Sequence, residues 1–471
     1  MSSSVADTEE KSSDPVPVRP RTGPPPTSAP EMKESEQVAG AEIDDHHDQP
    51  PDGGLQAWLQ VLGSWAILAD TWGLINTFGV FQTYYERVLL PGVSASDISW
   101  IGSLQGALLM IVGPLSGSLY DAGYFRPLLL VGIVLIVLGQ AMTSLATEYY
   151  QLVLAQGVCI GLGCGLTFLP STAILSQYFR RRRALVIGLA STGSPLAGSL
   201  FPLIFSRLEP AIGFGWTTRV IALVLLVLSI FPALFMRPRE SSSSSRAHAT
   251  PTPTPTPTPG PRPPRGMRSL VDESAFRDVP FLLVMTGGFF AFLTLYVAFF
   301  YIELFAVRHG IGPEGFSPYF VTLLNAGSIV GRVGPNYLAD KVGPLHILVG
   351  VLGASATLMF GWMGIRDFGG LVAFALLYGL FSGSVVSVTP TVVVSLAPDM
   401  ARVGTRMGMM FFACGLPILF GTPIAGAIVG GYSRAEWRAM IGYGAAGLAM
   451  ACVFTGLAGI YMRWEKHESS D

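Results

Sequence analysis

Three ionisable residues lie inside long apolar stretches of the chain: Asp70, Glu303 and Arg332. A charge inside a lipid bilayer is costly, which makes each of them a functional candidate. The planar fork of donors on Arg332 suits a carboxylate, so we predict that it binds substrate. A carboxyl group without a counter-ion can take up and release a proton, so we predict proton coupling at Asp70 and Glu303.

Each of these residues also has a structural interpretation. Arg332 can pair with backbone carbonyl groups or with Asp340 at the end of the same stretch. Asp70 can bond to a neighbouring helix as a neutral group, and Glu303 can contact water near the membrane interface. The sequence leaves both interpretations open.

Uncharged side chains supply further candidates. Asn76 and Asn325 lie in apolar stretches and are predicted to bind substrate, with hydrogen bonding between helices as the alternative. Tyr296 and Phe300 are one helical turn apart in an aromatic stretch, with Phe289 and Phe292 two turns and one turn earlier. They are predicted to line a cavity for a ring-containing substrate.

The apolar stretches that hold these residues indicate an integral membrane protein. Half of the residues are apolar, only 13% are charged, and the mean hydropathy is +0.50, whereas soluble domains carry about 25% charged residues. Runs of about 20 apolar residues are long enough to cross a bilayer, and continuous runs favour helices over barrel strands. We count twelve runs: 56–81, 98–119, 125–145, 149–174, 184–206, 217–236, 279–305, 317–338, 345–365, 369–396, 405–431 and 437–462.

The runs divide the chain into five parts. Residues 1–54 are acidic and poor in aromatic residues, so they are predicted to be a disordered cytoplasmic tail. Residues 55–236 and 279–462 each hold six runs and are predicted to form two six-helix bundles. Residues 237–278 contain serine and Thr-Pro repeats and are predicted to be a cytoplasmic linker loop. Residues 463–471 form a short cytoplasmic C-terminus.

Basic residues give the orientation. With both ends in the cytoplasm, the inner loops and C-terminus hold 17 basic residues and the outer loops hold 7, which agrees with the positive-inside rule. We expect a multi-pass protein of the cell membrane, with a vacuolar or vesicular membrane as the alternative.

Several functions are excluded by composition. The four cysteines lie in apolar runs without metal-ligand spacing, and the six histidines fall outside the runs or, for His346, at the edge of one. A phosphate-binding P-loop and a broad basic surface are also absent from the sequence. We therefore expect no enzyme activity, no cofactor, no metal and no nucleic-acid partner.

An internal repeat relates the two halves. Asp121 and Asp340 are 219 residues apart, each at the end of an apolar run, and three other pairs are 220 apart: Pro170 with Pro390, Arg182 with Arg402, and Gly188 with Gly408. Duplicated six-helix halves are common in secondary transporters, which bind substrate between the halves.

This layout resembles the major facilitator superfamily. The stretches Gly117-Ser-Leu-Tyr-Asp121 and Ala339-Asp340-Lys341-Val342-Gly343 are similar to the family's loop motif. The first copy lacks the basic residue after Asp121. The resemblance implies a gating role for the residues of these loops and their repeat partners: Asp121, Asp340, Lys341, Arg182 and Arg402.

Longer strings resemble the fungal branch of the monocarboxylate porter family. They are Pro51-Asp52-Gly53-Gly54 with Trp58, Phe78-Gly79-Val80-Phe81, the run from Tyr178 to Leu185, Gly331-Arg332, Gly404-Thr405-Arg406-Met407-Gly408 and Gly421-Thr422-Pro423. Short-acid carriers of that family have an arginine at the position of Arg332. They also have an aspartate four residues earlier, where this chain has Ser328, and a lysine late in the first span, which 74–77 lack. These departures favour a larger or less charged substrate.

The resemblance and the residues together indicate a secondary active transporter that works by alternating access. Its expected substrate is a small organic anion or a secondary metabolite, its expected coupling is to protons, and the lipid bilayer is its other partner. Efflux is favoured. An uptake carrier for a monocarboxylate or vitamin, and a nutrient sensor that does not transport, remain alternatives.

Overall fold

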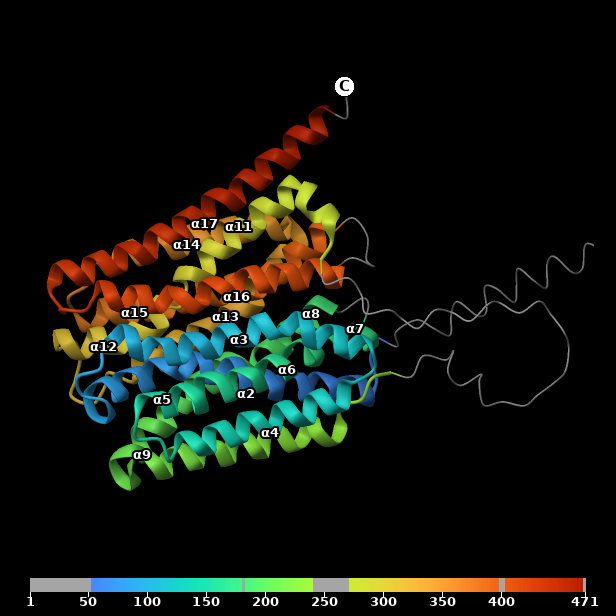
Figure 1. Cartoon of the computed structure of the whole chain (residues 1–471). Helices are drawn as coiled ribbons and strands as arrows, with labels where there is room; N and C mark the ends of the chain where they lie inside the picture. Colours follow the sequence, from blue (N-terminus) through green and yellow to red (C-terminus); the bar gives the residue numbers. More distant parts are fainter. Residues whose placement is uncertain (1–51, 180–182, 240–270, 398–402, 469–471) are drawn as a thin grey trace, which may run out of the picture. The chain divides into compact units, whose positions relative to one another are not determined.

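The apolar stretches form long helices that run side by side (Figure 1). The computed structural model describes residues 52–179, 183–239, 271–397 and 403–468, and these residues contain no β-strand. The first half comprises α2 (Leu55–Tyr84), the π-helical turn η1 (Tyr85–Leu89), α3 (Ala95–Asp121), α4 (Phe125–Thr143), α5 (Tyr149–Leu152), η2 (Val153–Ile160), α6 (Gly161–Ala173), α7 (Leu175–Tyr178), α8 (Arg183–Ser191) and α9 (Gly193–Phe235).

The second half is also built from long helices. It comprises the short η4 (Glu273–Arg277), α11 (Val279–Thr294), α12 (Val297–His309), α13 (Tyr319–Val342), α14 (Pro344–Trp362), α15 (Phe368–Leu396), α16 (Val403–Ile428) and α17 (Arg434–Glu468). The last helix thus continues past residue 462, where the sequence placed the end of the second bundle.

Local sequence signals explain several helix ends. The side chains of Ser94, Asp278 and Asp367 accept hydrogen bonds from backbone N–H groups in the first turns of α3, α11 and α15, which satisfies donors that have no partner within the helix. Within α9, Gly213 has a φ of 77°. This glycine turns the chain between the predicted fifth and sixth spans, which therefore follow one another directly.

Within the described ranges, nine helical stretches are long and apolar enough to cross a membrane. One of them, 185–235, holds the two spans on either side of Gly213. The nine do not include α2 and α13, the first and eighth of the twelve predicted spans. Both helices are long, but they carry the polar candidates Asp70, Asn76, Asn325 and Arg332, which lower their hydropathy.

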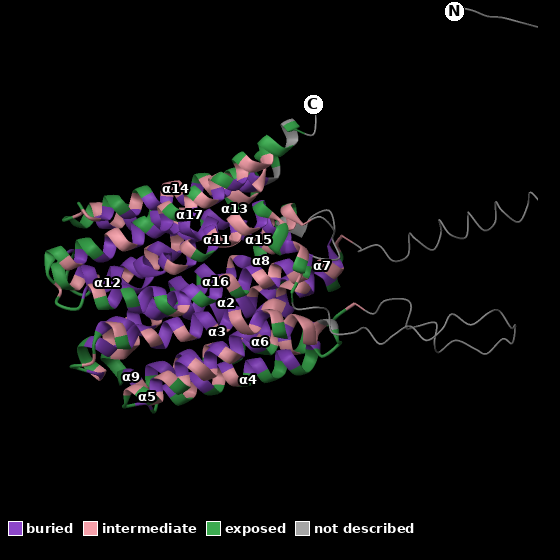
Figure 2. Ribbon diagram, turned by 45° about the horizontal axis from the view of Figure 1, so that its top comes forward, coloured by how far each residue is buried: buried purple, intermediate pink, exposed green. Residues whose placement is uncertain are grey.

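Helix packing follows the two halves. In the first half α2 packs along α9, and α6 lies against α3 and α4; in the second half α13 packs on α15, and α17 on α11 and α14. The halves meet where α3 contacts α16, where α8 and α9 contact α13, and where α2 contacts α12. Figure 2 shows burial concentrated in these central helices and exposed residues on outer helices such as α4 and α9. Such an apolar exposed face fits contact with lipid.

The helix ends define two sides of the molecule. We call the side where α3 and α9 end and where α11 and α16 begin the linker side, because the 237–278 segment joins α9 to α11 there. The opposite side, with the connections 85–94, 310–318 and 429–433, is called the far side.

Candidate functional site

A cavity of about 760 Å³ lies between the two halves, toward the linker side. Pockets for organic ligands commonly measure about 300–1,000 Å³, so this one can hold a ligand of several rings. Its lining comes from both halves, which fits the expected position of a substrate site in a duplicated transporter. The residues used below are Trp72, Met110, Phe168, Thr172, Ser191, Phe292, Arg332, Ser387, Thr389, Thr391, Met407 and Phe411.

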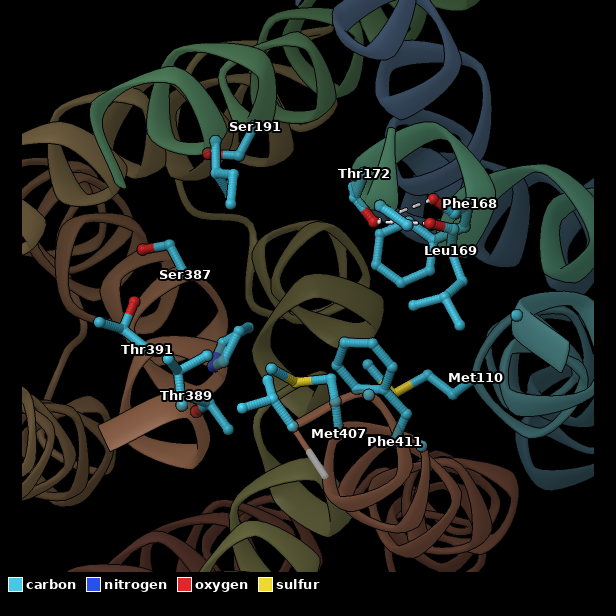
Figure 3. A pocket seen from close by; sticks show the side chains of 18 of the residues that line it. Met110, Phe168, Leu169, Thr172, Ser191, Ser387, Thr389, Thr391, Met407 and Phe411 are labelled. Carbon is cyan, nitrogen blue, oxygen red and sulfur yellow. Dashed lines mark hydrogen bonds between the residues drawn. The ribbon is translucent and has the colours of Figure 1, made fainter. Parts of the chain in front are cut away.

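The cavity has two walls of different chemistry (Figure 3). Four hydroxyl groups lie on one wall, where Ser191 comes from α8 and Ser387, Thr389 and Thr391 come from α15. We call this the hydroxyl wall. The hydroxyl of Thr172 lies on the other side, where it donates to the Phe168 carbonyl. Rings and thioethers form the opposite wall, which we call the aromatic wall: Trp72, Met110, Phe168, Phe292, Met407 and Phe411.

Arg332 on α13 lies beside the hydroxyl wall and is 4% exposed. Its Nη1 donates to the carbonyl oxygen of Ser191 across the two halves at 3.3 Å, and its Nε reaches the Ser328 hydroxyl at 3.5 Å. None of the described carboxylates forms an ion pair with it. The guanidinium therefore keeps N–H donors for a ligand, as well as the carbonyl contact that the structural interpretation predicted.

On the far side the halves are closed against each other. The Ser96 hydroxyl donates to the Pro423 carbonyl at 2.9 Å, and the hydroxyls of Ser199 and Thr322 each donate to the other's carbonyl at 3.3 and 3.2 Å. Gly79 lies so close to α12 that an added Cβ would be 2.2 Å from the Phe299 carbonyl oxygen. Small residues of this kind let helix backbones approach closely in a membrane.

A charged cluster around the buried Glu86 adds to this closure; we call it the far-side cluster. Glu86 in η1 accepts from Arg308 of α12 at 2.7 Å and from the Tyr432 hydroxyl at 2.7 Å, both through Oε1. The Arg308 guanidinium lies 4.1 Å from the centre of the Tyr432 ring. Burial, together with the hydrogen bond to Glu86, raises the pKa of Tyr432 above its usual value, so its hydroxyl remains a donor at neutral pH.

The two predicted proton-coupling residues lie outside the cavity lining. Asp70 is fully buried, accepts from the Ser229 hydroxyl of α9 at 2.7 Å through Oδ2, and leaves Oδ1 without a partner among the described residues. Glu303 is buried in α12 on the far side of the cavity, and its Oε2 has no partner in the described part of the chain. The structure therefore does not bring them together with Arg332.

The predicted substrate-binding residues with amide or aromatic side chains lie between the cavity and the far side. Asn76 donates to the Ser194 hydroxyl at 3.2 Å, and Asn325 donates to the Val321 carbonyl at 3.0 Å. Tyr296 stacks on Trp72 with ring centres 6.1 Å apart, and Phe300 packs on Phe78 at 4.8 Å. Tyr296 thus supports a ring of the aromatic wall, but none of these four residues lines the cavity.

The predicted gating residues lie at the linker side. Asp121 ends α3, while Asp340 and Lys341 lie in the last turn of α13. The Lys341 ammonium is 4.5 Å from the centre of the Tyr337 ring. Arg182 and Arg402 fall outside the described residues, so their gating role stays a prediction.

Sequence reasoning missed most of the aromatic wall. Phe292 of α11 was predicted to line a cavity and does so. Phe168 and Phe411 come from α6 and α16, and nothing in their local sequence separates them from ring side chains that face lipid. Trp72 carried the best signal, because it lies two residues from the charged candidate Asp70 in the first span. No group of three metal-binding side chains occurs within the described ranges.

Comparison with known proteins identifies the class. The model of the Major Facilitator Superfamily matches residues 56–369, and the chain belongs to this family, so it is a multi-pass membrane transporter. It is similar to the MFS-type transporter dbaD of Emericella nidulans, with 39% identity over 83% of this chain and 84% of the relative.

Two further relatives are also fungal transporters. The Aspyridones efflux protein apdF of Emericella nidulans is 34% identical to this chain, over 81% of this chain and 74% of the relative's length. The MFS-type transporter 1 of Ophiocordyceps sp. is 34% identical over 83% of this chain and 84% of its own. The predicted superfamily and transport function are confirmed by these matches.

Proposed function

We propose that the protein exports a secondary metabolite by alternating access, taking it up from the linker side and releasing it on the far side. One observation carries the proposal: the cavity lies toward the linker side, while hydrogen bonds and close helix contacts join the halves on the far side. The similarity to a relative named as an efflux protein supports the direction.

The linker side is the cytoplasmic side in this proposal, so both termini lie in the cytoplasm and the cell membrane is the location. The excess of basic residues in the predicted inner loops supports that orientation. We also place the chain in the fungal branch of the monocarboxylate porter family, on the sequence strings described above. The carrier is proposed to act without catalysis.

Arg332 is the proposed anchor for an acidic group of the substrate. A charge-assisted hydrogen bond from guanidinium to carboxylate or enolate is directional and stronger than a neutral one. Removal of one partner from such a buried pair typically costs about 1.5–3 kcal/mol. Arg332→Gln should therefore lower the apparent affinity for an acidic substrate by roughly 10- to 100-fold.

Proton coupling is proposed at Asp70, with Glu303 as a second candidate. The Ser229 hydroxyl donates to one oxygen of Asp70, and the other oxygen lacks a partner among the described residues, so the group can be charged or neutral. Asp70 lies on α2 two residues from Trp72 of the cavity, so a change of its charge state acts on the helix that contributes Trp72 to the aromatic wall.

Proteoliposome flux with an imposed pH gradient tests the proposal. The substrates are labelled carboxylates, aspyridones and metabolites secreted by the host, each measured for wild type, Arg332→Gln, Asp70→Asn and Glu303→Gln. We expect flux driven by the gradient in wild type, a raised half-saturation concentration for acids in Arg332→Gln, and loss of the gradient dependence in Asp70→Asn.

Other outcomes select the alternatives. Transport only of short monocarboxylates or vitamins, directed toward the linker side, would assign an uptake carrier. A folded wild type that binds ligands and moves none of them would assign a sensor. Gradient dependence that survives in Asp70→Asn but disappears in Glu303→Gln would move the coupling to Glu303.

A further inference from the structure

The chemistry of the aromatic and hydroxyl walls together indicates which class of ligand the cavity binds. We infer that the cavity selects a planar, conjugated ring system with an acidic oxygen at one edge. This inference rests on the proposed function and names the substrate class of the same site.

The aromatic wall is a continuous set of rings from both halves. Trp72 of α2 meets Phe168 of α6 with centres 5.8 Å apart and planes at 81°, and Phe168 meets Phe411 of α16 at 5.8 Å and 47°. Tyr296 stacks on Trp72, with an interplanar angle of 15°. Rings held in place by neighbours lose little conformational freedom when a ligand ring packs on them.

A planar ligand gains more from this wall than a saturated one. Aromatic pairs contribute about 0.5–1.5 kcal/mol beyond the area that they bury, which is roughly a two- to tenfold gain in affinity for each ring contact. Met110 and Met407 lie on the same wall (Figure 3), and thioethers also contact ring edges favourably. The aromatic wall therefore favours a ligand with flat rings over a saturated ligand of the same apolar area.

Three of the four hydroxyl groups on the hydroxyl wall present acceptors rather than donors. Ser191, Ser387 and Thr389 donate their hydroxyl hydrogens to carbonyl groups of their own helices at 2.7, 3.2 and 2.6 Å. Their oxygens remain able to accept from a hydroxyl group of the ligand. Arg332 is the one charged side chain in the described lining, so an anionic oxygen has a single favoured position beside this wall.

The two walls face each other across the cavity (Figure 3), so one ligand can meet both at once. Its rings would lie against Phe168 and Phe411, and its acidic edge would lie toward Arg332. A short acid would occupy only a small part of the 760 Å³ and would not reach both walls. A flexible saturated acid would reach both, but without the ring contacts.

Binding of three matched probes to the purified full-length protein tests the inference. The probes are 3-hydroxy-2-naphthoate, 3-hydroxydecahydro-2-naphthoate and 3-(hydroxymethyl)-2-naphthol, measured by isothermal titration calorimetry in detergent. We expect hydroxynaphthoate to bind at least tenfold more tightly than either of the others. The second probe lacks flat rings and the third lacks the acid.

Variants assign the two preferences to the two walls. Phe411→Leu and Phe168→Leu should each reduce the preference for the planar over the saturated acid by roughly three- to tenfold. Arg332→Gln should remove the preference for the acid over the alcohol and keep the preference for flat rings. Phe454→Leu is the control, because Phe454 stacks on Phe290 at 5.6 Å and neither lines the cavity.

Equal affinity of wild type for the planar and the saturated acid would overturn the inference, and this comparison needs no variant to fold. An unchanged preference in both phenylalanine variants would also overturn it. The flux experiment tests the proposed export independently of the ligand class. Selective binding of hydroxynaphthoate without transport would refute the export and leave the ligand class unchanged.

Discussion

Charged clusters, each with a buried member, lie at both ends of the helices, and they join different parts of the chain. On the far side, Glu86 of the first half pairs with Arg308 and Tyr432 of the second half. On the linker side, Arg406 of α16 pairs with Asp272 and Asp278, which precede α11 in the same half. We call the second group the linker-side cluster.

This difference between the two clusters indicates where the two halves can separate. The far-side cluster crosses between the halves, so it must break when that side opens. The ion pairs described on the linker side stay within one half, so they stabilise that half whether the cavity is open or closed. Variants of the linker-side cluster should therefore change stability, and variants of the far-side contacts should change the balance between conformations.

The largest effect is expected for Arg406→Met. Arg406 is 2% exposed, binds Asp278 at 2.5 Å and Asp272 at 3.1 Å, and also donates to the Leu396 carbonyl at 3.3 Å. Removal of one partner from a buried ion pair typically destabilises by about 3–5 kcal/mol. The melting temperature in detergent should fall sharply in a thermal unfolding assay.

Arg463→Met is the matched control for this variant. Arg463 is exposed at the linker end of α17 and contacts His346 at 2.8 Å, so its loss should leave the melting temperature nearly unchanged. Equal melting temperatures for the Arg406 and Arg463 variants would contradict the structural role of the linker-side cluster.

A smaller effect, on conformation rather than stability, is expected for Gly79→Val. The added side chain would push α2 away from the Phe299 carbonyl, and overpacking of this kind costs about 1–3 kcal/mol. The closed far side should become less populated. A cysteine introduced at Ser103, which is buried beside Thr422, should then react at least fivefold faster with an impermeant maleimide from the far side.

Gly350→Val controls for the size of the side chain. Gly350 lies in α14 with no atom within 4 Å of an added Cβ, so labelling at residue 103 should match that of the parent. If both glycine variants label alike, the close approach at Gly79 does not hold the far side closed.

Features that depend on the local sequence were predictable, whereas contacts between distant parts of the chain were not. Helix positions and the exceptional residue Arg332 were predictable, because apolar length and a charge within it are properties of the local sequence. Partners such as Glu86 with Tyr432 were not, since 346 residues separate them and nothing local indicates their contact. The same limit explains why Phe168 and Phe411 were missed. Tyr296 was predicted to line the cavity, but it lies one layer behind the lining, against Trp72.

Glu86→Gln should open the far side moderately. The amide keeps an acceptor for Tyr432 but loses the ion pair with Arg308, whose side chain is 41% exposed and therefore partly screened. We expect a cost of about 1 kcal/mol and labelling of the Ser103→Cys reporter that is roughly fivefold faster. A double-mutant cycle with Arg308→Gln should give a double variant no faster than Glu86→Gln; additive effects would show that the pair is not coupled.

The smallest effect is expected for Tyr432→Phe. The variant keeps the ring under Arg308 and loses only the hydrogen bond to Glu86, so the cost should be roughly 0.5 kcal/mol. Because burial and Glu86 raise the pKa of Tyr432, the hydroxyl stays protonated, and its contribution is lost only as the pH rises above the ordinary value of about 10. The labelling difference between wild type and Tyr432→Phe should thus be constant from about pH 6 to pH 9. A difference that disappears within this range would show that the hydroxyl ionises there and does not hold the far side closed as a donor.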